Sequence, residues 1–234
     1  MRFDIITIFP ELFLPLLECG ILRRARQSGI AQIRIVNLRD FASDKHKTVD
    51  DRPYGGGEGM VLMPGPLFDA VEYCRGSERT PGTRVVLMTP QGRTWSQDIA
   101  EEFSTIPHLI LISGRYEGVD QRVVDCLVDS EVSIGDFVLT GGEIPAMVIL
   151  DSVVRLLPGA LGHVDSSVNE SFSTGLLDCP QYTRPSQFRG MAVPEVLLSG
   201  DHARILRWRR ERALEKTLRV RPELVKKQTG GEAS

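Results

Sequence analysis

The sequence is poor in cysteine and has no long apolar run, and both absences restrict the possible functions. Its four cysteines stand far apart, with no Cys-x-x-Cys pair and no histidine at a spacing that would complete a zinc site: Cys19, Cys74, Cys126 and Cys179. No apolar stretch approaches membrane length, and Met1 leads into an amphipathic strand rather than a signal peptide. We therefore expect reduced thiols and a soluble, cytoplasmic protein without a membrane anchor.

The glycine signatures of common nucleotide-binding folds are missing as well. No predicted strand opens into Gly-x-Gly-x-x-Gly, and no Gly-x-x-x-x-Gly-Lys-Ser/Thr loop occurs. The run from Gly55 to Gly59 is similar only in composition, because the polar segment from Asp50 to Tyr54 precedes it where a phosphate loop requires an apolar strand. We expect this run to form a flexible flap.

Charge is distributed unevenly along a chain of otherwise globular composition. The 234 residues are 41% hydrophobic and 25% charged, which suffices for one full core and a smaller second domain. The net charge is −3, yet residues 202–227 contain ten Arg or Lys against three acids. Such a local basic patch indicates a polyanionic partner, because counterion release from phosphates requires clustered cations. Taken alone, it fits a solvated helix face equally well.

Short apolar runs alternate with amphipathic segments over the first two thirds of the chain. The apolar runs have strand length: Phe3 to Phe9, Ile33 to Val36, Val85 to Met88, Leu109 to Ile112 and Val132 to Ile134. The segments between them repeat apolar residues every three or four positions, as helices do: near Glu11 to Gln27, Pro66 to Cys74, Ser96 to Phe103 and Val119 to Leu127. This pattern predicts an α/β fold with a parallel sheet covered on both faces.

A change of composition after residue 160 predicts a second domain. The helix expected from Glu143 to Leu156 is stopped by Pro158 and Gly159, and residues 161–174 have the small, polar composition of a flexible linker. Residues 175–234 are expected to be helical and basic. In the helix from His202 to Leu218, an apolar packing face is predicted opposite a basic one: Ala203, Leu206, Ala213, Leu214 and Leu218 against Arg209, Arg212 and Lys216.

Three polar, glycine-containing loops follow three of the predicted strands. They are Thr89 to Arg93, Ser113 to Gly118 and Ile134 to Asp136. Ligands of open α/β sheets bind at the carboxyl ends of strands, and glycine lets the backbone approach a ligand closely. A single loop of this kind is more simply a turn, but three convergent loops predict a pocket built mainly of main chain, which suits a small cofactor better than a metal.

Four long motifs, in this order, resemble the bacterial tRNA (guanine-N1)-methyltransferases. The resemblance spans nearly the whole chain, and the motifs are Asp50 to Met60 (DDRPYGGGEGM), Ser113 to Asp120 (SGRYEGVD), Ser133 to Glu143 (SIGDFVLTGGE) and Leu176 to Pro180 (LLDCP). It implies a SPOUT-class fold, a parallel α/β sheet with a C-terminal trefoil knot, and a small helical tRNA-binding domain at residues 175–234. Residues 1–160 would form the methyltransferase domain.

The resemblance also implies an activity. A methyl group would pass from S-adenosylmethionine to N1 of the guanine at tRNA position 37, next to the anticodon, in a homodimer with its active site at the subunit interface. The family depends on Mg²⁺, but we see no carboxylate cluster that predicts a metal site. The cofactor-binding positions implied are Leu87, Thr89, Pro90, Gln91, Gly92, Gly114, Tyr116, Glu117, Gly118, Ile134, Gly135, Asp136, Phe137, Val138, Leu139, Gly141, Gly142 and Pro145.

Two positions match the catalytic pair of the family. N1 of guanine carries a proton, so methylation calls for a base near N1 and a cation near O6. By resemblance, Arg155 would polarise O6 and Glu170, from the facing subunit, would take the proton. The family usually has aspartate at the latter position, and Asp165 and Asp178 are rival bases. Without the resemblance, Arg155 is equally well explained as a cation that stabilises a helix C-terminus.

Six residues are expected to bind RNA: Asp50, Tyr54, Asp178, Arg209, Arg212 and Lys216. Two alternatives remain open at this point. A non-catalytic RNA-binding protein would explain the basic patch but not the three convergent loops. Another SPOUT enzyme, which methylates a ribose hydroxyl or a pyrimidine N3, would explain both, although a carboxylate base favours a ring N–H as the substrate group.

Overall fold

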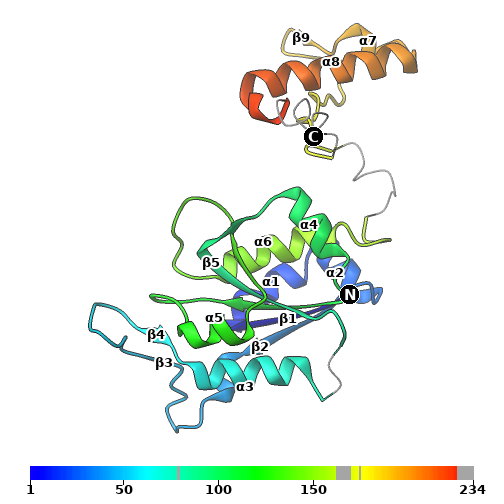
Figure 1. Ribbon diagram of the computed structural model, residues 1–234. Helices are drawn as coiled ribbons and strands as arrows, with labels where there is room; N and C mark the ends of the chain where they lie inside the picture. The colour runs from blue at the N-terminus through cyan, green and yellow to red at the C-terminus, as the bar shows by residue number, and fades with distance from the viewer. Residues whose placement is uncertain (78–79, 162–169, 174, 226–234) are drawn as a thin grey trace. The chain divides into compact units, whose positions relative to one another are not determined.

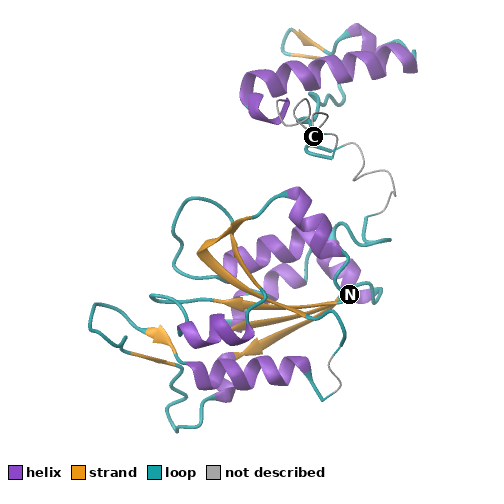
Figure 2. Ribbon diagram, in the orientation of Figure 1, coloured by secondary structure: helices purple, strands orange, loops and turns teal. Residues whose placement is uncertain are grey.

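The computed structural model describes residues 1–77, 80–161, 170–173 and 175–225. The chain divides into two compact units, Met1–Gly162 and His163–Ser234. The first unit carries the α/β fold and the second is mainly helical (Figures 1 and 2). None of the described helices is long and apolar enough to cross a membrane.

The first unit is built on a parallel sheet of five strands, which confirms the α/β fold predicted from the alternating pattern. The strand order is β2-β1-β6-β5-β7, and every pair is parallel. The bounds are β1 Arg2–Thr7, β2 Gln32–Asn37, β5 Arg84–Thr94, β6 His108–Ser113 and β7 Ser130–Ser133. All six residues of the central strand β6 are buried, as expected for a strand covered on both faces.

Helices cover both faces of the sheet (Figure 1). On one side lie α1 (Leu14–Leu17), α2 (Gly20–Gln27), α4 (Gln97–Ser104) and α6 (Glu143–Val154). On the other side lie α3 (Pro64–Arg75) and α5 (Gln121–Leu127). A hydrophobic core lies on each face of the sheet, and alternate residues of β6 belong to one or the other. Leu109 and Leu111 pack in the core under α1, α2, α4 and α6, and Ile110 and Ile112 in the core under α3 and α5.

The prediction of a single helix near Glu11 to Gln27 is wrong. The chain instead forms a short 3₁₀ helix, η1 (Pro10–Leu12), and then α1 and α2. The break falls between α1 and α2, where Gly20 has a φ of 55° that most other residues would find strained. Two other helices are capped: the Ser96 hydroxyl accepts a hydrogen bond from the Ile99 N–H at the start of α4, and Gly76 follows the end of α3 with a φ of 69°.

The glycine-rich run lies in a hairpin and not at the start of a helix. Residues 52–60 connect β3 (Asp50–Asp51) to β4 (Val61–Leu62), and these two strands pair antiparallel. A phosphate loop requires a strand that leads into a helix, so this run is not one, as its sequence context predicted.

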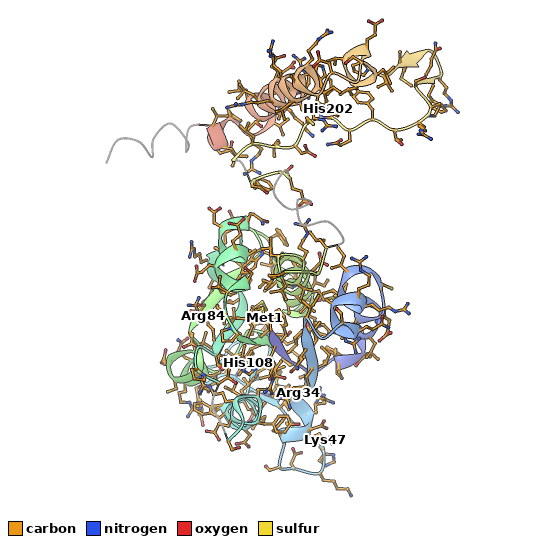
Figure 3. All side chains as sticks on the ribbon, turned by 90° about the vertical axis from the view of Figure 1, so that its right-hand side faces the viewer. Met1, Arg34, Lys47, Arg84, His108 and His202 are labelled. Atoms are coloured by element: carbon orange, nitrogen blue, oxygen red, sulfur yellow. The ribbon has the colours of Figure 1, made fainter. Side chains whose placement is uncertain are left out.

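A buried carboxylate joins three strands near the amino ends of the sheet. Asp4 has 0% exposure and accepts hydrogen bonds from Arg34 Nε at 2.6 Å and His108 Nε2 at 2.8 Å, and it forms an ion pair with Arg2 at 2.8 Å. Figure 3 shows His108 and Arg34 in the first unit. Burial alone raises the pKa of Asp4, but the hydrogen bonds from His108 and Arg34 and the positive charges of Arg34 and Arg2 outweigh it, so the pKa lies below its ordinary value of 3.8.

We expect Asp4→Asn to lower the free energy of unfolding by about 3 kcal/mol, because it leaves buried cationic and polar partners without their anion. Since the folded pKa is lowered, the stability that Asp4 contributes is complete above pH 3.8 and is lost as the pH falls through the folded pKa. The variant should therefore lose less stability than the wild type between pH 5 and pH 2. Urea unfolding across this range measures both effects, and equal stability of the two proteins at pH 7 would contradict the assignment.

The described part of the second unit contains a short hairpin, the helices α7 (Glu195–Leu198) and α8 (His202–Val220), and helical residues 222–225. The hairpin pairs β8 (Gln187–Phe188) with β9 (Met191–Ala192), and α7 precedes the long helix α8. The predicted packing face of α8 is wrong within this unit. Of its apolar positions, Leu206, Leu214 and Leu218 are exposed, whereas Thr217 is buried and Arg212 and Lys216 are half-buried.

The reason for this error lies in the hydrogen bonds around Thr217. Its hydroxyl accepts from the Leu177 N–H at 2.9 Å and donates to the Ala213 carbonyl at 2.7 Å. Trp208 lies close to Tyr182, with ring centroids 6.3 Å apart. Residues 177 and 182 therefore contact α8 at Thr217 and Trp208, which lie on opposite sides of the helix, so the contacts do not follow the apolar face that hydrophobicity marks.

Candidate functional site

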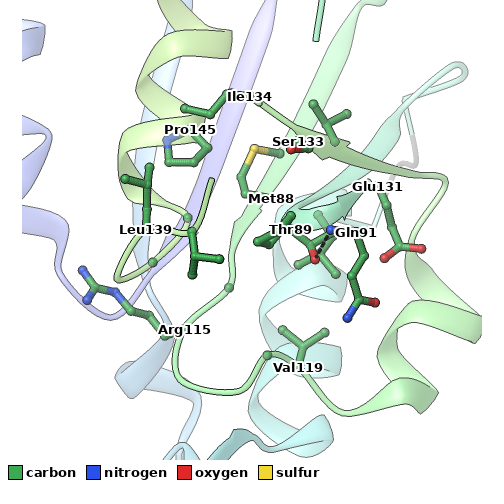
Figure 4. Close-up of a pocket in the computed structure, with 18 of the residues that line it drawn as sticks. Met88, Thr89, Gln91, Arg115, Val119, Glu131, Ser133, Ile134, Leu139 and Pro145 are labelled. Atoms are coloured by element: carbon green, nitrogen blue, oxygen red, sulfur yellow. Dashed lines mark hydrogen bonds between the residues drawn. The ribbon is translucent and has the colours of Figure 1, made fainter. Parts of the chain in front are cut away.

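A cavity of about 390 Å³ opens at the carboxyl ends of β5, β6 and β7, where the three glycine-containing loops meet (Figure 4). This volume lies in the range of small-molecule sites. Apolar side chains form part of the lining, with Leu139, Pro145 and Ile134 on one side of it, and Gln91 and Glu131 lie on the other side. The cavity is therefore mixed in character, with main chain, apolar and polar walls.

Most of the predicted cofactor-binding residues line this cavity. They are Leu87, Thr89, Pro90, Gln91, Gly114, Tyr116, Glu117, Gly118, Ile134, Gly135, Phe137, Val138, Leu139, Gly141, Gly142 and Pro145. Gly92 and Asp136 are not part of the lining. A Cβ at Gly92 would stand 2.3 Å from the Val132 nitrogen, so this glycine serves the close packing of β5 on β7.

The lining also contains residues that the sequence did not single out: Met88, Arg115, Val119, Gln121, Val124, Glu131, Val132, Ser133 and Thr140. Most of them are neighbours of predicted residues in the same loops and strand ends. The rule that ligands bind at strand carboxyl ends could have found them if the whole of each loop had been counted.

Two successive glycines allow the two main walls to approach each other. The Gly142 N–H donates to the Gly114 carbonyl at 2.8 Å, and a Cβ on Gly142 would lie 2.8 Å from the Gly114 nitrogen and from the Cα of Ser113. A Cβ on Gly141 would lie 2.2 Å from Nε of Arg115. The segment before α6 thus passes against the end of β6 at a distance that no side chain permits.

An ion pair between the partly exposed Arg115 and the buried Glu143 lies beside these glycines. Arg115 Nε donates to Oε2 of Glu143 at 2.9 Å, and its Nη1 donates to the Thr140 carbonyl at 3.1 Å. Glu143 is 1% exposed and also accepts from the Thr7 hydroxyl at 2.9 Å. The pair links β1, the loop after β6 and the start of α6.

The glycine-rich hairpin is attached to the cavity through the loop after β6. The Glu117 N–H donates to the Met60 carbonyl and the Leu62 N–H donates to the Gly118 carbonyl, both at 3.0 Å. Gly59 lies so close to the Glu117 side chain that a Cβ there would meet its Oε1 at 2.6 Å. Tyr54, in contrast, is completely exposed, so the hairpin presents an aromatic ring to solvent.

Arg155 lies at the other end of α6 from the cavity. It is the C-terminal cap of this helix, twelve residues after Glu143, which corresponds to roughly 18 Å along the axis. Pro145, near the start of the same helix, lines the cavity, and Arg155 does not. The structure therefore does not bring Arg155 to the cavity of the same chain.

Glu170 belongs to the second unit, whereas the cavity belongs to the first. It starts a turn in which the Ser173 N–H donates to its carbonyl at 3.3 Å. The rival base Asp178 is hydrogen-bonded to its neighbours in the chain: its carboxylate accepts from the Cys179 N–H at 2.7 Å and from the Gln181 side chain at 3.0 Å. The other rival, Asp165, lies outside the described residues.

The basic residues of α8 have different environments. Arg209 is exposed and lines a second cavity of about 390 Å³, together with Tyr182 and Arg184. Arg212 forms an ion pair with Glu215 at 2.6 Å. Of these positions, Arg209 is therefore the more accessible to a phosphate.

Comparison with known proteins places the chain in a family. A family model described as tRNA (Guanine-1)-methyltransferase TrmD matches residues 1–227. The tRNA (guanine-N(1)-)-methyltransferase of Dictyoglomus turgidum is 56% identical over 227 residues, which cover 97% of this chain and 91% of the relative. Proteins of the same name from Geobacillus kaustophilus and Geobacter sulfurreducens are each 54% identical, over 96% and 97% of this chain and 91% and 92% of the relatives, respectively. The chain therefore belongs to the tRNA (guanine-1)-methyltransferase family, as its four motifs predicted.

Proposed function

We propose that the protein transfers a methyl group from S-adenosylmethionine to N1 of the guanine at position 37 of tRNA. The observation that carries this proposal is the cavity at the ends of β5, β6 and β7, which is lined by motifs that the chain shares with its family. A non-catalytic RNA-binding protein is not favoured, because it would leave this cavity without a role. The 54–56% identity to tRNA (guanine-N(1)-)-methyltransferases likewise disfavours a different SPOUT reaction.

The cavity suits S-adenosylmethionine in size and in the chemistry of its walls. Exposed main chain at Gly114 and in residues 134–139 would hydrogen-bond the polar edges of the cofactor, while Leu139 and Pro145 would contact its apolar surfaces. When bound, the cofactor supplies a methyl group on an electrophilic sulfonium. The trefoil knot of SPOUT proteins would lie in this part of the chain, where Gly142 packs closely against Gly114.

Arg155 and Glu170 would activate the guanine. Negative charge gathers on O6 as N1 loses its proton, and a guanidinium held at O6 stabilises that charge. A carboxylate at N1 accepts the proton. Both roles require side chains that do not belong to the cavity described above, because Arg155 lies roughly 18 Å along α6 from Glu143.

A homodimer would bring Arg155 to the cavity of the partner subunit. Ile144 and Val148 are 55% and 40% exposed on α6, and Arg155, eleven residues after Ile144, returns to within about 20° of the same helix face. In a two-fold contact, equivalent faces meet. Packing this face of α6 antiparallel on its copy would place Arg155 near the start of the partner's helix and hence near the partner's cavity.

The remaining assignments concern the tRNA. Residues 1–160 would form the catalytic domain and residues 175–234 a tRNA-binding domain, joined by a linker at 161–174 that lies largely outside the described residues. Asp50 and Tyr54 on the hairpin would contact the anticodon loop, and Asp178 a neighbouring base. Arg209, Arg212 and Lys216 would contact phosphates, and Arg209 is the best exposed of the three.

The resemblance to the family implies Mg²⁺ as a further cofactor. Among the residues that the structure describes, no group of three or more His, Cys, Asp or Glu side chains could hold a metal ion. The roles given above to Arg155 and Glu170 do not require one.

The activity is tested by incubating the protein with an unmodified tRNA transcript and labelled S-adenosylmethionine, followed by nuclease digestion and mass spectrometry. We expect 1-methylguanosine at position 37 and no label in a transcript that carries adenine there. A ribose-methylated nucleoside or a methylated pyrimidine would establish one of the other SPOUT reactions. Binding of tRNA without any methyl transfer would favour the non-catalytic alternative.

A further inference from the structure

We propose that Glu143 is a positioning residue that fixes the distance between the two main walls of the methyl-donor cavity. The inference rests on the proposed function, because it concerns affinity for S-adenosylmethionine. Glu143 does not line the cavity, and the catalytic scheme above gives it no role. It acts through Arg115. The backbone of Arg115 belongs to one wall, the loop after β6, and its side chain donates to the other wall, the segment before α6.

Glu143 occupies a junction of three segments. One carboxylate oxygen accepts from the Thr7 hydroxyl at the end of β1, and the other accepts from Nε of Arg115 in the loop after β6, each at 2.9 Å. Glu143 is itself the first residue of α6, where the partial positive charge of the helix N-terminus favours an anion. A single buried side chain therefore ties the end of β1, the loop after β6 and the start of α6 together.

Arg115 transmits this constraint to the cavity. Its Nη1 donates to the Thr140 carbonyl at 3.1 Å, its backbone pairs with Gly141, and its guanidinium lies 4.5 Å from the centre of the Phe9 ring. In Figure 4 the side chain extends away from Gln91 and Glu131, on the side of the cavity where Leu139 lies. The guanidinium thus clamps the segment that carries Leu139 to the loop that carries Arg115.

The ion pair of Glu143 with Arg115 is better suited to fixing the orientation of the two walls than to stabilising the fold. Moving a carboxylate and a guanidinium out of water costs about as much as their attraction returns, so a buried ion pair contributes little net stability compared with apolar residues of the same volume. What it fixes is orientation, because both partners are held by directional hydrogen bonds. Displacements of about 1 Å in a binding wall are sufficient to change function strongly.

The test compares Glu143→Gln with a matched buried carboxylate elsewhere in the same unit. Glutamine keeps the shape of the side chain and can accept one of the two hydrogen bonds, but it removes the charge that holds Arg115. We expect the Kd for S-adenosylmethionine, measured by calorimetry, to rise about 10-fold, with the KM for tRNA changed less than about 2-fold. Asp4→Asn removes a buried carboxylate near the opposite ends of the strands and should lower the Tm while leaving that Kd within about 2-fold of the wild type.

A second variant keeps the inference falsifiable if Glu143→Gln does not fold. Thr7→Val removes the hydroxyl that donates to the other carboxylate oxygen and that also accepts from the Phe9 N–H at 3.0 Å, and it should raise the same Kd about 3-fold. If Glu143→Gln lowers the Tm as Asp4→Asn does but binds the cofactor like the wild type, Glu143 is merely structural and the inference is overturned. A Thr7→Val protein with wild-type affinity overturns it in the same way. If the wild type itself fails to bind S-adenosylmethionine, the proposed function fails first.

Discussion

Replacing Glu170 with glutamine should abolish methyl transfer while leaving the affinity for S-adenosylmethionine unchanged. Glutamine has nearly the same shape but cannot accept the N1 proton, and loss of a general base costs at least about 100-fold in rate. The cofactor cavity lies in the first unit and Glu170 in the second, so the substitution does not touch the lining. Single-turnover transfer of labelled methyl groups measures the rate, and calorimetry measures the Kd.

Glu170→Asp is the matched control, because it restores the residue usual in the family and retains a base. We expect it to keep substantial activity, since a turn such as the one at residues 170–173 can adjust to a side chain one methylene shorter. Near-normal turnover by Glu170→Gln would remove the assignment. The base would then have to be Asp178 or Asp165, and Asp178→Asn would be the next variant to measure.

Those elements of the fold that depend on local pattern were predictable from the sequence. Apolar runs of three to seven residues marked the main strands, and helical periodicity marked most of the helices between them. The cavity followed from a topological rule, because strands of a parallel sheet all present their carboxyl ends at one edge. The helix predicted near Glu11 to Gln27 is interrupted at Gly20, which has a positive φ. The sequence did contain a signal for this break, since glycine is unfavourable in the interior of a helix.

The features that escaped prediction all depend on partners distant in the sequence. Asp4 and His108 are 104 residues apart and Thr7 and Glu143 are 136 apart, so no local window contains either pair. The packing face of α8 was mistaken because Thr217, a polar residue, is buried by a hydrogen bond to Leu177 that periodicity does not reveal. Arg155 was assigned by resemblance, but only the length of α6 shows that it lies at the other end of this helix from the cavity of the same chain.

Gly142→Ala should eliminate most of the affinity for S-adenosylmethionine. The φ of Gly142 is −82°, which alanine adopts freely, so any effect arises from the new Cβ. That atom would lie 2.8 Å from the Gly114 nitrogen, the Ser113 Cα and the Met88 Cβ, and the two walls must separate to admit it. We expect the Kd measured by calorimetry to rise more than about 10-fold and the stability to fall by about 1–3 kcal/mol.

Gly65→Ala is the control for this substitution. A Cβ there meets no atom within 4 Å, and the residue lies in the first turn of α3, so alanine should leave both stability and cofactor affinity intact or raise stability slightly. Wild-type affinity in Gly142→Ala would show that the two walls move apart without cost. The close contact at Gly142 would then not define the cavity.

Gly142→Ala also tests whether Arg155 acts across the proposed subunit interface. In a mixed dimer of one Gly142→Ala subunit and one Arg155→Ala subunit, the intact cavity belongs to the Arg155→Ala chain and the intact arginine to the other. If Arg155 serves the partner's cavity, one of the two sites is complete. At an S-adenosylmethionine concentration near the wild-type Kd, the mixed dimer should then have about half of the wild-type activity, while the Gly142→Ala homodimer keeps little activity and the Arg155→Ala homodimer none. If Arg155 serves its own cavity, neither site is complete. Co-expression with two different tags and tandem purification gives the mixed dimer, and an inactive product would contradict the antiparallel packing of α6 that the exposed Ile144 and Val148 support.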